Sequence, residues 1–548
     1  MSGHPEEWIP IRPGTDGALA SALNYVFVTE GTADEEFLHS HTVGYDEETM
    51  PEHLKGQNKS YKDYLLGTGY DMVAKTPEWA EPITGIPADT IKNLAHEIAA
   101  AKSCFISSTF APQRHNNGEM AAWSVSMVPV ISGHIGRPGT SNGMKSSSAY
   151  MFAPVGCVVP YDSNATVENP CKVMYPQAKI FEVLDHAAGM TAEHDGILGT
   201  DKLTKDVKIA VFRHAGNVST ACDGNYAAEV LSDESKVEFI LGSSMFMGTT
   251  MTFCDIVLPD VCDYELPINM RFTMGDSTHF GLVFGKQIQE PYFECRNERD
   301  WCADLAEKFD LREEYTEGYE DFSQWVKDTY EKNKGAAIID LPPFEEGFEK
   351  GLIEYPNDTP VVAYQDWRED IENHPMATED GKLHIYSESI EAAWKAMTFD
   401  DPRDKIMPIP AYQPEIEGVD DLNEEYPLQF VNWKWWNGFH TVSNAVQEIS
   451  QAMRHTLWIN PVDAEARGIQ NGDHVLCSSE RGTIGIEARV TPRIMPGVVG
   501  TGTGAWQKWD ENGVDQGGAA NTLSARHLTP LAKGHSGNGS TNVQVVKG

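Results

Sequence analysis

Apolar residues in the first 150 positions follow alternating helical and extended patterns. A run rich in alanine and leucine predicts a helix over 18–28, and an amphipathic run predicts another over 87–101. The apolar stretch 103–108 predicts a buried strand, and a polar loop after it leads into a helix that ends near residue 132. This order of strand, loop and helix predicts an α/β domain over residues 1–150.

A second α/β domain is predicted over residues 206–420, after an irregular linker at 151–205. Three apolar stretches, at 207–212, 237–242 and 255–259, alternate with helical patterns. That alternation is typical of a doubly wound, mostly parallel sheet. From about residue 300 onward the domain is expected to carry an acidic, mainly helical insert.

The pattern changes around Tyr426, where short strands and tight turns replace the helices. Turn pairs such as Asn471-Gly472 separate the strands, as expected of hairpins. Residues 421–548 are therefore predicted to form a separate, compact β-barrel domain of ordinary size. The predicted strands are 427–431, 472–477 and 483–490.

Composition narrows the classes of function. The 548 residues carry 41% apolar side chains, which is enough for several packed domains, and a formal net charge of −40. Such a surface repels the phosphates of nucleic acids, so no nucleic-acid partner is expected. The sequence holds no run of about twenty apolar residues, so direct membrane insertion is not expected either.

The nine cysteines form no metal-ligand pattern. None is paired at C-x-x-C spacing, and their odd number argues against a disulfide framework. We therefore assign no residue of this chain as a metal ligand. The opening residues carry no basic region, apolar stretch or twin arginine, so no export signal is predicted. A chain that reaches its first turn within about a dozen residues either begins there naturally or has lost a front segment.

The turn from Arg12 to Asp16 precedes the first predicted helix. Its proline and glycine shape the turn, and Thr15 or Asp16 can cap the helix. An aspartate in this place can also accept two hydrogen bonds from the N1 and N2 donors of a guanine. The turn alone favours the simpler interpretation, an ordinary capped helix.

A polar loop follows the predicted strand at 103–108, at the edge where α/β sheets bind ligands. Its side chains Gln113, Arg114 and Asn117, beside Gly118, offer several hydrogen-bond donors and acceptors. Such a set suits a heteroatom-rich ligand such as a pterin. A solvated loop is an equally good interpretation.

A second polar turn, with His214, Gly216 and Asn217, follows the predicted strand at 207–212. The histidine can be a ligand or a proton donor, although a lone histidine is more often structural. An aromatic run at 433–439 can line a substrate funnel or pack in a core. The C-terminal region adds amides, hydroxyls and a carboxylate suited to a polar cofactor. These candidates are His440, Thr441, Asn460, Asp463, Asn521 and Asn542.

Taken in order, these segments resemble the catalytic A subunit of anaerobic dimethyl sulfoxide reductases, within the molybdopterin oxidoreductase family. No P-loop, G-x-S-x-G elbow, H-E-x-x-H or G-x-G-x-x-G fingerprint competes with this resemblance. Each matching motif is short, but the motifs run nearly from end to end in the order of the family. They are Ile11–Asp16, Val43–Asp46, Lys75–Trp79, Pro112–His115 with Asn117–Glu119, Ala215–Asn217, Asp255–Pro259, Trp458–Pro461, Val490–Val498, Gly504–Trp506, Asn521–Leu523 and Pro530–Gly534.

The resemblance implies a molybdenum ion held by two molybdopterin guanine dinucleotides between domains, and a barrel of the double-psi type. Asp16 would bind the guanine of one dinucleotide. Gln113, Arg114 and Asn117 would lie along a pterin, with Asn217 near the same cofactor. The barrel would cover the second pterin with the six C-terminal candidates.

The implied activity is two-electron oxygen-atom transfer, in which the cofactor carries the chemistry and the protein supplies binding and electrostatics. We expect a reductase that removes an oxygen atom from a small S-oxide or N-oxide in anaerobic respiration. The resemblance also implies an iron–sulfur electron-transfer subunit, a membrane anchor subunit and a place on the extracytoplasmic face of the cell membrane. An iron–sulfur cluster and the metal ligand are expected only in a segment ahead of this chain, so the isolated chain is expected to be inactive.

Departures from the family pattern leave alternative hypotheses open, both for the substrate and for the class of function. Ser132–Gly136 differs from the usual Thr-Gly-Asn-Val-Gly, and Arg213-His214 stands where family members have a tyrosine. The tryptophan cluster ahead of His440 replaces a more basic segment. The substrate could therefore be an aromatic hydroxyl compound or an inorganic oxyanion instead. The alternative from another class is a non-catalytic scaffold of the same fold, which would not need to keep polar residues such as Asp16 and Asn521.

Overall fold

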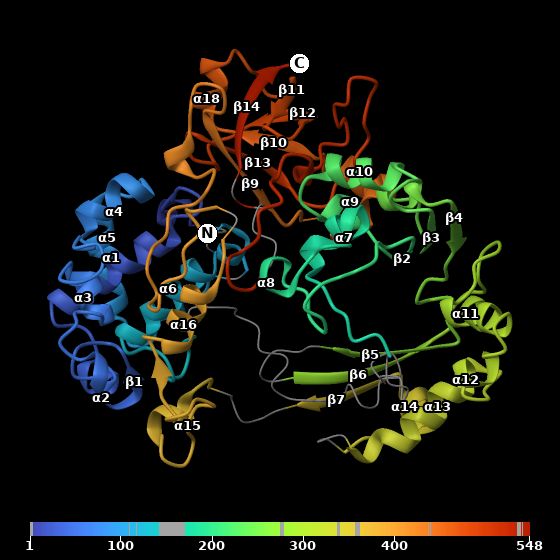
Figure 1. The fold of residues 1–548 in the computed structure, drawn as a ribbon, viewed down its shortest axis with the longest axis horizontal. Coiled ribbons are helices and arrows are strands. Elements are labelled where there is room, and N and C mark those ends of the chain that lie inside the picture. The colour runs from blue at the N-terminus through green and yellow to red at the C-terminus, as the bar shows by residue number, and fades with distance from the viewer. Residues whose placement is uncertain are drawn as a thin grey trace.

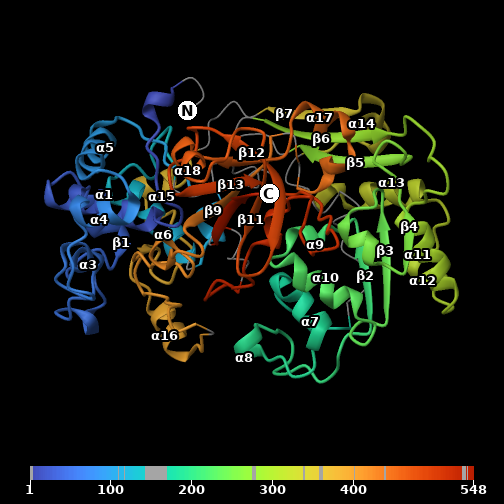
Figure 2. The same cartoon turned by 90° about the horizontal axis from the view of Figure 1, so that it is seen from above.

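The computed structural model describes residues 4–108, 110–116, 118–141, 170–273, 279–336, 340–356, 362–399, 401–436, 438, 440–533, 539 and 541–548. Figure 1 shows a mainly helical part at the left, a β-barrel at the top and an α/β part at the right. Seen from above in Figure 2, the barrel lies between the other two parts. The barrel is therefore placed to contact both of them.

The first domain is a bundle of helices around α1 (Asp16–Thr29), which α3, α4, α5 and α6 contact. Residues on several sides of α1, among them Ala18, Leu23 and Phe27, are buried by these neighbours. The helices predicted over 18–28 and 87–101, and the one that ends near residue 132, are confirmed as α1, α5 and α6. The other elements here are η1 (Pro5–Glu7), α2 (Glu35–His41), β1 (Thr42–Val43), η2 (Glu52–Leu54), α3 (Tyr61–Leu66), α4 (Pro77–Thr84), α5 (Ala88–Ala100), η3 (Pro112–Arg114) and α6 (Gly118–Ile131).

The strand predicted over 103–108 is not formed in the described residues. A strand requires hydrogen bonds from a neighbouring strand. At Ile106 a side chain takes that place, because the hydroxyl of Ser141 accepts from its N–H at 3.2 Å and donates to its carbonyl. The segment is assigned no strand within the described residues, although Ser107 takes part in a single β-bridge.

A segment distant in sequence completes the core of the first domain. We predicted residues 206–420 to belong to the second domain, but Trp367, Ile385 and Ile409 are buried in the same apolar cluster as α1 and α6. The short strand β8 (Leu383–His384) pairs in parallel with β1. The domain boundary was misplaced because the pattern of one segment does not show which core it joins. Helices α15 (Gln365–Glu369) and α16 (Glu388–Ala396) belong to this returning segment.

The second α/β part is built on a three-stranded parallel sheet in the order β2-β3-β4, which confirms the predicted parallel α/β arrangement. The strands span Ile209–Arg213, Phe239–Ser244 and Ile256–Pro259. The predicted irregular linker is partly wrong, since α7 (Ile180–His186) packs its Phe181 and Leu184 into the core of this part. The remaining elements are η5 (Gln177–Lys179), α8 (Ala192–Asp195), α9 (Asn217–Thr220), α10 (Gly224–Ser232) and η6 (Thr249–Phe253).

The acidic insert contains the predicted helices together with an antiparallel sheet that the sequence pattern did not indicate. This sheet, in the order β5-β6-β7, packs Met270 and Phe284 against Tyr330 and Phe344. The strands are β5 (Ile268–Thr273), β6 (His279–Lys286) and β7 (Leu352–Pro356). The helices are α11 (Glu298–Glu307), α12 (Arg312–Thr316), α13 (Phe322–Asn333), η7 (Lys334–Ala336) and α14 (Phe344–Lys350).

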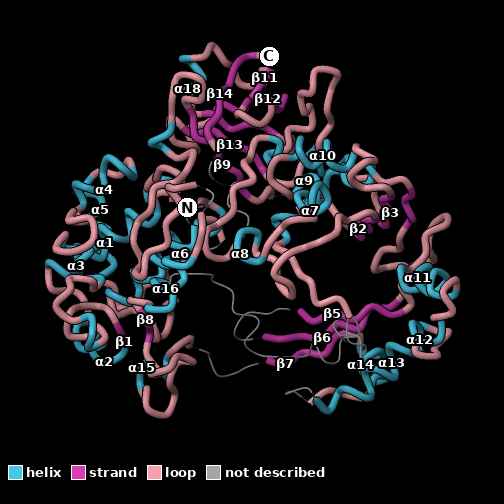
Figure 3. Tube along the Cα trace, in the orientation of Figure 1, coloured by secondary structure: helices cyan, strands magenta, loops and turns pink. Residues whose placement is uncertain are grey.

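The C-terminal strands close into a six-stranded barrel in the order β10-β12-β11-β14-β9-β13, as predicted for this region. Two of its pairs, β10 with β12 and β13 with β9, are parallel, and the others are antiparallel. Figure 3 shows these strands gathered at the top of the molecule. They span β9 (Leu428–Trp433), β10 (Thr456–Ile459), β11 (His474–Ser478), β12 (Thr483–Val490), β13 (Val498–Gly502) and β14 (Asn542–Lys547). Short helical elements accompany them: η8 (Val419–Asp421), η9 (Val442–Ala445), α17 (Gln447–Ala452), α18 (Pro461–Ala466) and η10 (Ala520–Thr522).

Candidate functional site

A cavity of about 380 Å³ lies between the first domain and the barrel. Asp16, the first residue of α1, lines it together with Arg114. From the barrel side come Trp433, Trp458 and Arg493. The cavity is within the usual size range of small-molecule sites, and it brings the predicted residues Asp16 and Arg114 together.

The turn that presents Asp16 is fixed by its own polar groups and by the end of α4. The backbone N–H of Arg12 donates to the Thr84 carbonyl at 2.9 Å, and its guanidinium donates to the carbonyls of Pro82 and Ile83. The hydroxyl of Thr15 donates to the Arg12 carbonyl at 2.7 Å. Thr15, a predicted ligand residue, is thus used inside the turn and is 2% exposed. Its role is to hold the turn that places Asp16 at the cavity.

Positive charge gathers beside Arg114. Lys434 lies with its Nζ 3.1 Å from Nδ1 of His440, a residue with a left-handed backbone angle φ of 53°. Burial, with Arg114 next in effect, lowers the pKa of Lys434. Burial, then Lys434 and Arg114, lowers the pKa of His440. A cationic cluster in a chain of net charge −40 is suited to an anionic group such as a phosphate.

A strap of four residues, Glu415–Gly418, ties the first domain to the barrel. Nδ1 of His115 lies 2.7 Å from the Glu415 carboxylate, and the Asn116 amide donates to the Ile416 carbonyl at 2.6 Å. On the barrel side, both terminal nitrogens of Arg481 donate hydrogen bonds to the Glu417 carboxylate, at 2.8 and 2.6 Å. The amide of Asn542 donates to the Gly418 carbonyl at 3.1 Å. The strap therefore holds the two walls of the cavity together.

A second group of predicted residues meets where the barrel contacts α9. Gly216 lies so close to Thr441 that a Cβ on it would stand 2.6 Å from the threonine hydroxyl oxygen. Asn217 begins α9, and the Asn521 amide donates to the Ser219 carbonyl at 2.9 Å. These four predicted residues come from two domains and converge on one interface. Because His440 precedes Thr441 in the chain, the cationic cluster joins this group to the first cavity.

Two predicted ligand residues serve the barrel itself. The side chain of Asn460 caps α18 by accepting from Val462 N–H at 3.0 Å, and its amide donates to the Ile494 carbonyl at 2.7 Å. Asp463 accepts from Gly497 N–H at 2.8 Å. Helix caps and cofactor sites use the same residue types, which is why the sequence did not distinguish them.

The loop before α6 is only partly described. Gln113 lies in η3 and is half-buried, while Asn117 lies outside the described residues. Gly118 begins α6, and a Cβ there would come within 2.4 Å of the Pro112 carbonyl oxygen. Glycine at this position is therefore explained by close backbone packing.

Sequence reasoning missed four residues that build these sites: His115, Glu415, Trp458 and Gln507. His115 and Trp458 stand inside the family motifs Pro112–His115 and Trp458–Pro461, so the motifs contain the signal that indicates them. Glu415 and Gln507 act through contacts with segments distant in sequence, and no local pattern indicates them.

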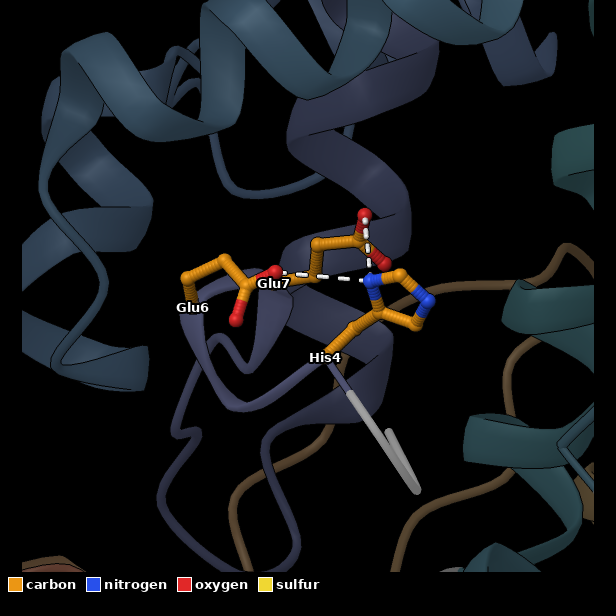
Figure 4. A group of neighbouring side chains, drawn as sticks. All are labelled: His4, Glu6 and Glu7. Carbon is orange, nitrogen blue, oxygen red and sulfur yellow. Dashed lines mark hydrogen bonds and ion pairs between the residues drawn. The ribbon is translucent and has the colours of Figure 1, made fainter.

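Two groups of histidine and acidic side chains within the described residues have ligand atoms close enough for a metal ion. His4, Glu6 and Glu7 are exposed and stand at the beginning of the described residues, and Figure 4 shows the histidine paired with both glutamates. The other group is Glu35, His39 and Asp46, and Lys62 already neutralises Glu35 at 3.2 Å. Ion pairing accounts for both groups, and none of these residues lines the cavity at Asp16. The described cysteines form no disulfide.

The residues present fit a guanine nucleotide. The buried indole N–H of Trp458, at the cavity, and the buried amide oxygen of Asn542 have no hydrogen-bond partner among the described residues. Buried polar atoms are nearly always paired, so such atoms indicate room for a polar ligand. Asp16 supplies an acceptor for guanine N–H groups, Arg114 and Lys434 supply cations for phosphate, and the tryptophans supply apolar walls.

Comparison with known proteins agrees with this geometry. The family profile described as Molybdopterin oxidoreductase matches residues 2–308, and the Molydopterin dinucleotide binding domain matches residues 428–540. The chain belongs to the molybdopterin oxidoreductase family. It is 38% identical over its whole length to dimethyl sulfoxide reductase DmsA of Escherichia coli (strain K12), covering 66% of that protein. It is 29% identical to the dimethyl sulfoxide/trimethylamine N-oxide reductase of Rhodobacter capsulatus, with 96% of this chain and 63% of that protein covered.

Among solved structures, acetylene hydratase from Pelobacter acetylenicus has the same fold, with a TM-score of 0.68 at 16% identity. The match covers 99% of this chain and 71% of that one. The chain spans about two thirds of the length of the curated relatives it matches. Among the described helices, none combines the length and the apolar character that a bilayer crossing requires.

Proposed function

We propose that this chain is the part of a molybdenum-dependent reductase that encloses two molybdopterin guanine dinucleotides between its domains. One dinucleotide would have its guanine in the cavity at Asp16, and the other would lie at the interface of Gly216, Asn217 and Thr441. The observation that carries the proposal is the convergence of these predicted residues from three parts of the chain on two sites at the barrel. The cationic cluster lies between the two sites.

The residues of this chain bind and orient, and they exclude water. Asp16 would accept hydrogen bonds from the guanine base, and the Trp458 indole N–H would donate to an acceptor of the same ligand. Arg114 and Lys434 would hold phosphate. When bound, the metal cofactor supplies two-electron oxygen-atom transfer, and the protein supplies binding and orientation.

The substrate class and the partners extend this proposal to the whole protein. The relatives are named as reductases of dimethyl sulfoxide and trimethylamine N-oxide, which supports a small S-oxide or N-oxide substrate in anaerobic respiration. An iron–sulfur electron-transfer subunit, a membrane anchor subunit and a place on the extracytoplasmic face of the membrane complete the proposal. Growth of cells expressing the whole protein, with dimethyl sulfoxide as sole electron acceptor, tests the substrate. Cell fractionation tests the location.

Binding of guanosine monophosphate to this chain tests the cavity directly. Tryptophans 8, 433 and 458 line it, so their fluorescence should change as the nucleotide is added. We expect the substitution Asp16→Asn to weaken binding on the order of tenfold, because a carboxylate acceptor is lost. Adenosine monophosphate is the control ligand, since adenine lacks the paired N–H donors of guanine. Equal affinity for both nucleotides, or no binding at all, would contradict the guanine site and favour the non-catalytic scaffold.

A further inference from the structure

Glu415 lies in the strap, some three hundred residues along the chain from the loop that it contacts. Its side chain is 4% exposed, and its carboxylate stands 2.7 Å from Nδ1 of His115. His115 is itself 12% exposed and lines the cavity beside Arg114. A buried carboxylate is costly unless it is paired, and both oxygens of Glu415 are buried without a hydrogen bond of good geometry among the described residues, so its charge contact with His115 holds the carboxylate against the loop on one side of the cavity.

The same carboxylate packs against the turn on the other side. A Cβ placed on Gly14 would lie 2.1 Å from Oε2 of Glu415, so only glycine leaves room for it. Gly14 also has φ of 75°, a left-handed angle that glycine adopts without strain. Two residues later the chain presents Asp16 to the cavity. One carboxylate thus contacts both the Arg114 loop and the Asp16 turn.

We propose that Glu415 is a positioning residue of the guanine-nucleotide site: by pairing with His115 and packing on Gly14, it sets the spacing between Arg114 and Asp16. This inference rests on the proposed function of the cavity. Glu415 itself does not line the cavity, so it would affect nucleotide binding only indirectly, by positioning His115 and Gly14. Small errors in the spacing of two binding groups reduce affinity strongly, because both groups must reach one ligand at once.

Charge makes the arrangement sensitive to pH. Burial lowers the pKa of His115, but Glu415 and, more weakly, Asp16 outweigh it, so the pKa is raised above its ordinary value. These two carboxylates are the charged groups that shift the pKa of the imidazole among the described residues, and the exposed Arg114 is its neighbour in the chain. When His115 loses its proton at higher pH, the Glu415 carboxylate is left without a counter-charge, and the nucleotide site should weaken.

The test is a titration of the full chain with guanosine monophosphate, followed by tryptophan fluorescence from about pH 5.5 to about pH 8.5, where histidine titrates. The wild-type chain should bind less tightly as pH rises. The substitution Glu415→Gln removes the negative charge and should weaken binding on the order of tenfold, with the midpoint of the pH profile moved to lower pH. Replacing the exposed Glu424 with Gln is the matched control and should leave affinity and midpoint unchanged.

Three further variants keep the result interpretable. Glu415→Asp keeps the charge on a shorter side chain, so it should weaken binding while leaving the midpoint where the wild type has it; it also serves if Glu415→Gln does not fold. The single variant His115→Asn and the double variant His115→Asn with Glu415→Gln complete the cycle. The double variant should lose no more affinity than the larger single loss, because the two residues act as a unit. An unmoved midpoint in Glu415→Gln, wild-type affinity in Glu415→Asp, or additive losses would overturn the inference. Absence of nucleotide binding in the wild type would instead contradict the proposed function.

Discussion

The hydroxyl of Ser219 in α9 donates a buried hydrogen bond of 2.6 Å to the side-chain oxygen of Gln507 in the barrel domain. The amide nitrogen of the same glutamine donates to the Val218 carbonyl at 3.1 Å, and Asn521 donates to the Ser219 carbonyl. The barrel therefore contacts the second α/β part through a network of satisfied polar groups. Such a network stabilises an interface only while every member keeps its partner.

Replacing Gln507 with leucine should destabilise the protein, because it removes two hydrogen bonds of this network. The Val218 carbonyl would stay buried and lose this donor, and the Ser219 hydroxyl would lose its shorter hydrogen bond and keep only the one to Thr249 at 3.2 Å. We expect a loss of about 1–3 kcal/mol in the free energy of unfolding, measured by denaturant titration. The substitution Gln470→Leu, at an exposed position, is the control and should change stability little. Equal losses in the two variants would contradict a specific role for Gln507.

Gly14 and Gly31 form a matched pair for testing the contact with Glu415. Both have left-handed angles, φ of 75° and 71°, but a Cβ on Gly31 would meet no atom within 4 Å. Gly31→Ala should therefore lower the free energy of unfolding by about 1 kcal/mol, which is the cost of holding alanine at a left-handed backbone angle. Gly14→Ala should cost at least about 2 kcal/mol, because its methyl group must also displace the Glu415 carboxylate. Denaturant unfolding of the two variants, measured side by side, gives the difference between their losses of unfolding free energy. Equal losses would show that the Glu415 carboxylate moves aside freely.

The close approach of Gly216 to Thr441 predicts a rescue. Gly216→Ala places a methyl group 2.6 Å from the threonine hydroxyl oxygen, and we expect a loss of about 1–3 kcal/mol in unfolding free energy. Adding Thr441→Ala removes that oxygen and should recover most of the loss. Thermal unfolding of both single variants and the double variant provides the measurement. A double variant no more stable than Gly216→Ala would mean that the alanine strains some other contact.

His214 makes stability depend on pH. Nε2 of His214 lies 2.8 Å from the buried carboxylate of Asp260, and this hydrogen bond raises the histidine pKa against the opposing effect of burial. The stabilisation is complete below the unfolded pKa of about 6.5 and is lost as pH rises through the higher folded value. Because the side chain is 47% exposed, solvent screening limits the effect to less than about 1 kcal/mol.

The matched variants for this prediction are His214→Gln and His374→Gln. His214→Gln should reduce the decline in unfolding free energy between about pH 6 and about pH 9 and leave the part that His115 contributes, because glutamine does not titrate. His374 is exposed and serves as the control, so its variant should keep the wild-type profile. An unchanged slope in His214→Gln would assign the pH dependence to another group.

Much of the candidate site could be predicted because its residues stand in short polar turns. Asp16 at the start of α1 and Asn217 at the start of α9 are placed by local sequence, where proline, glycine and small polar residues define the turn. The barrel could be predicted from its strands and turns in the same way. Residues 421–548 showed the right periodicity without any knowledge of the other domains.

What could not be predicted depends on contacts across the chain. The Glu415 carboxylate and the Gln507 amide are ordinary polar groups in sequence, and only the fold places them against His115 and Ser219. The extended segment at 103–108 has the composition of a strand, but whether it pairs depends on a neighbour rather than on its own residues. The residue type of Asn460 is one that often binds polar ligands, but in the fold its side chain caps a helix.

The strap Glu415–Gly418 has a kinetic consequence. Its first two residues hold the first domain and its last two hold the barrel, so parting the walls of the cavity requires breaking both attachments on one side of the strap together. Such opening is a single sub-global event rather than a gradual loosening. A nucleotide seated between the walls would leave only as often as the strap opens. Its residence time would then report the frequency of that opening more than the strength of its own contacts.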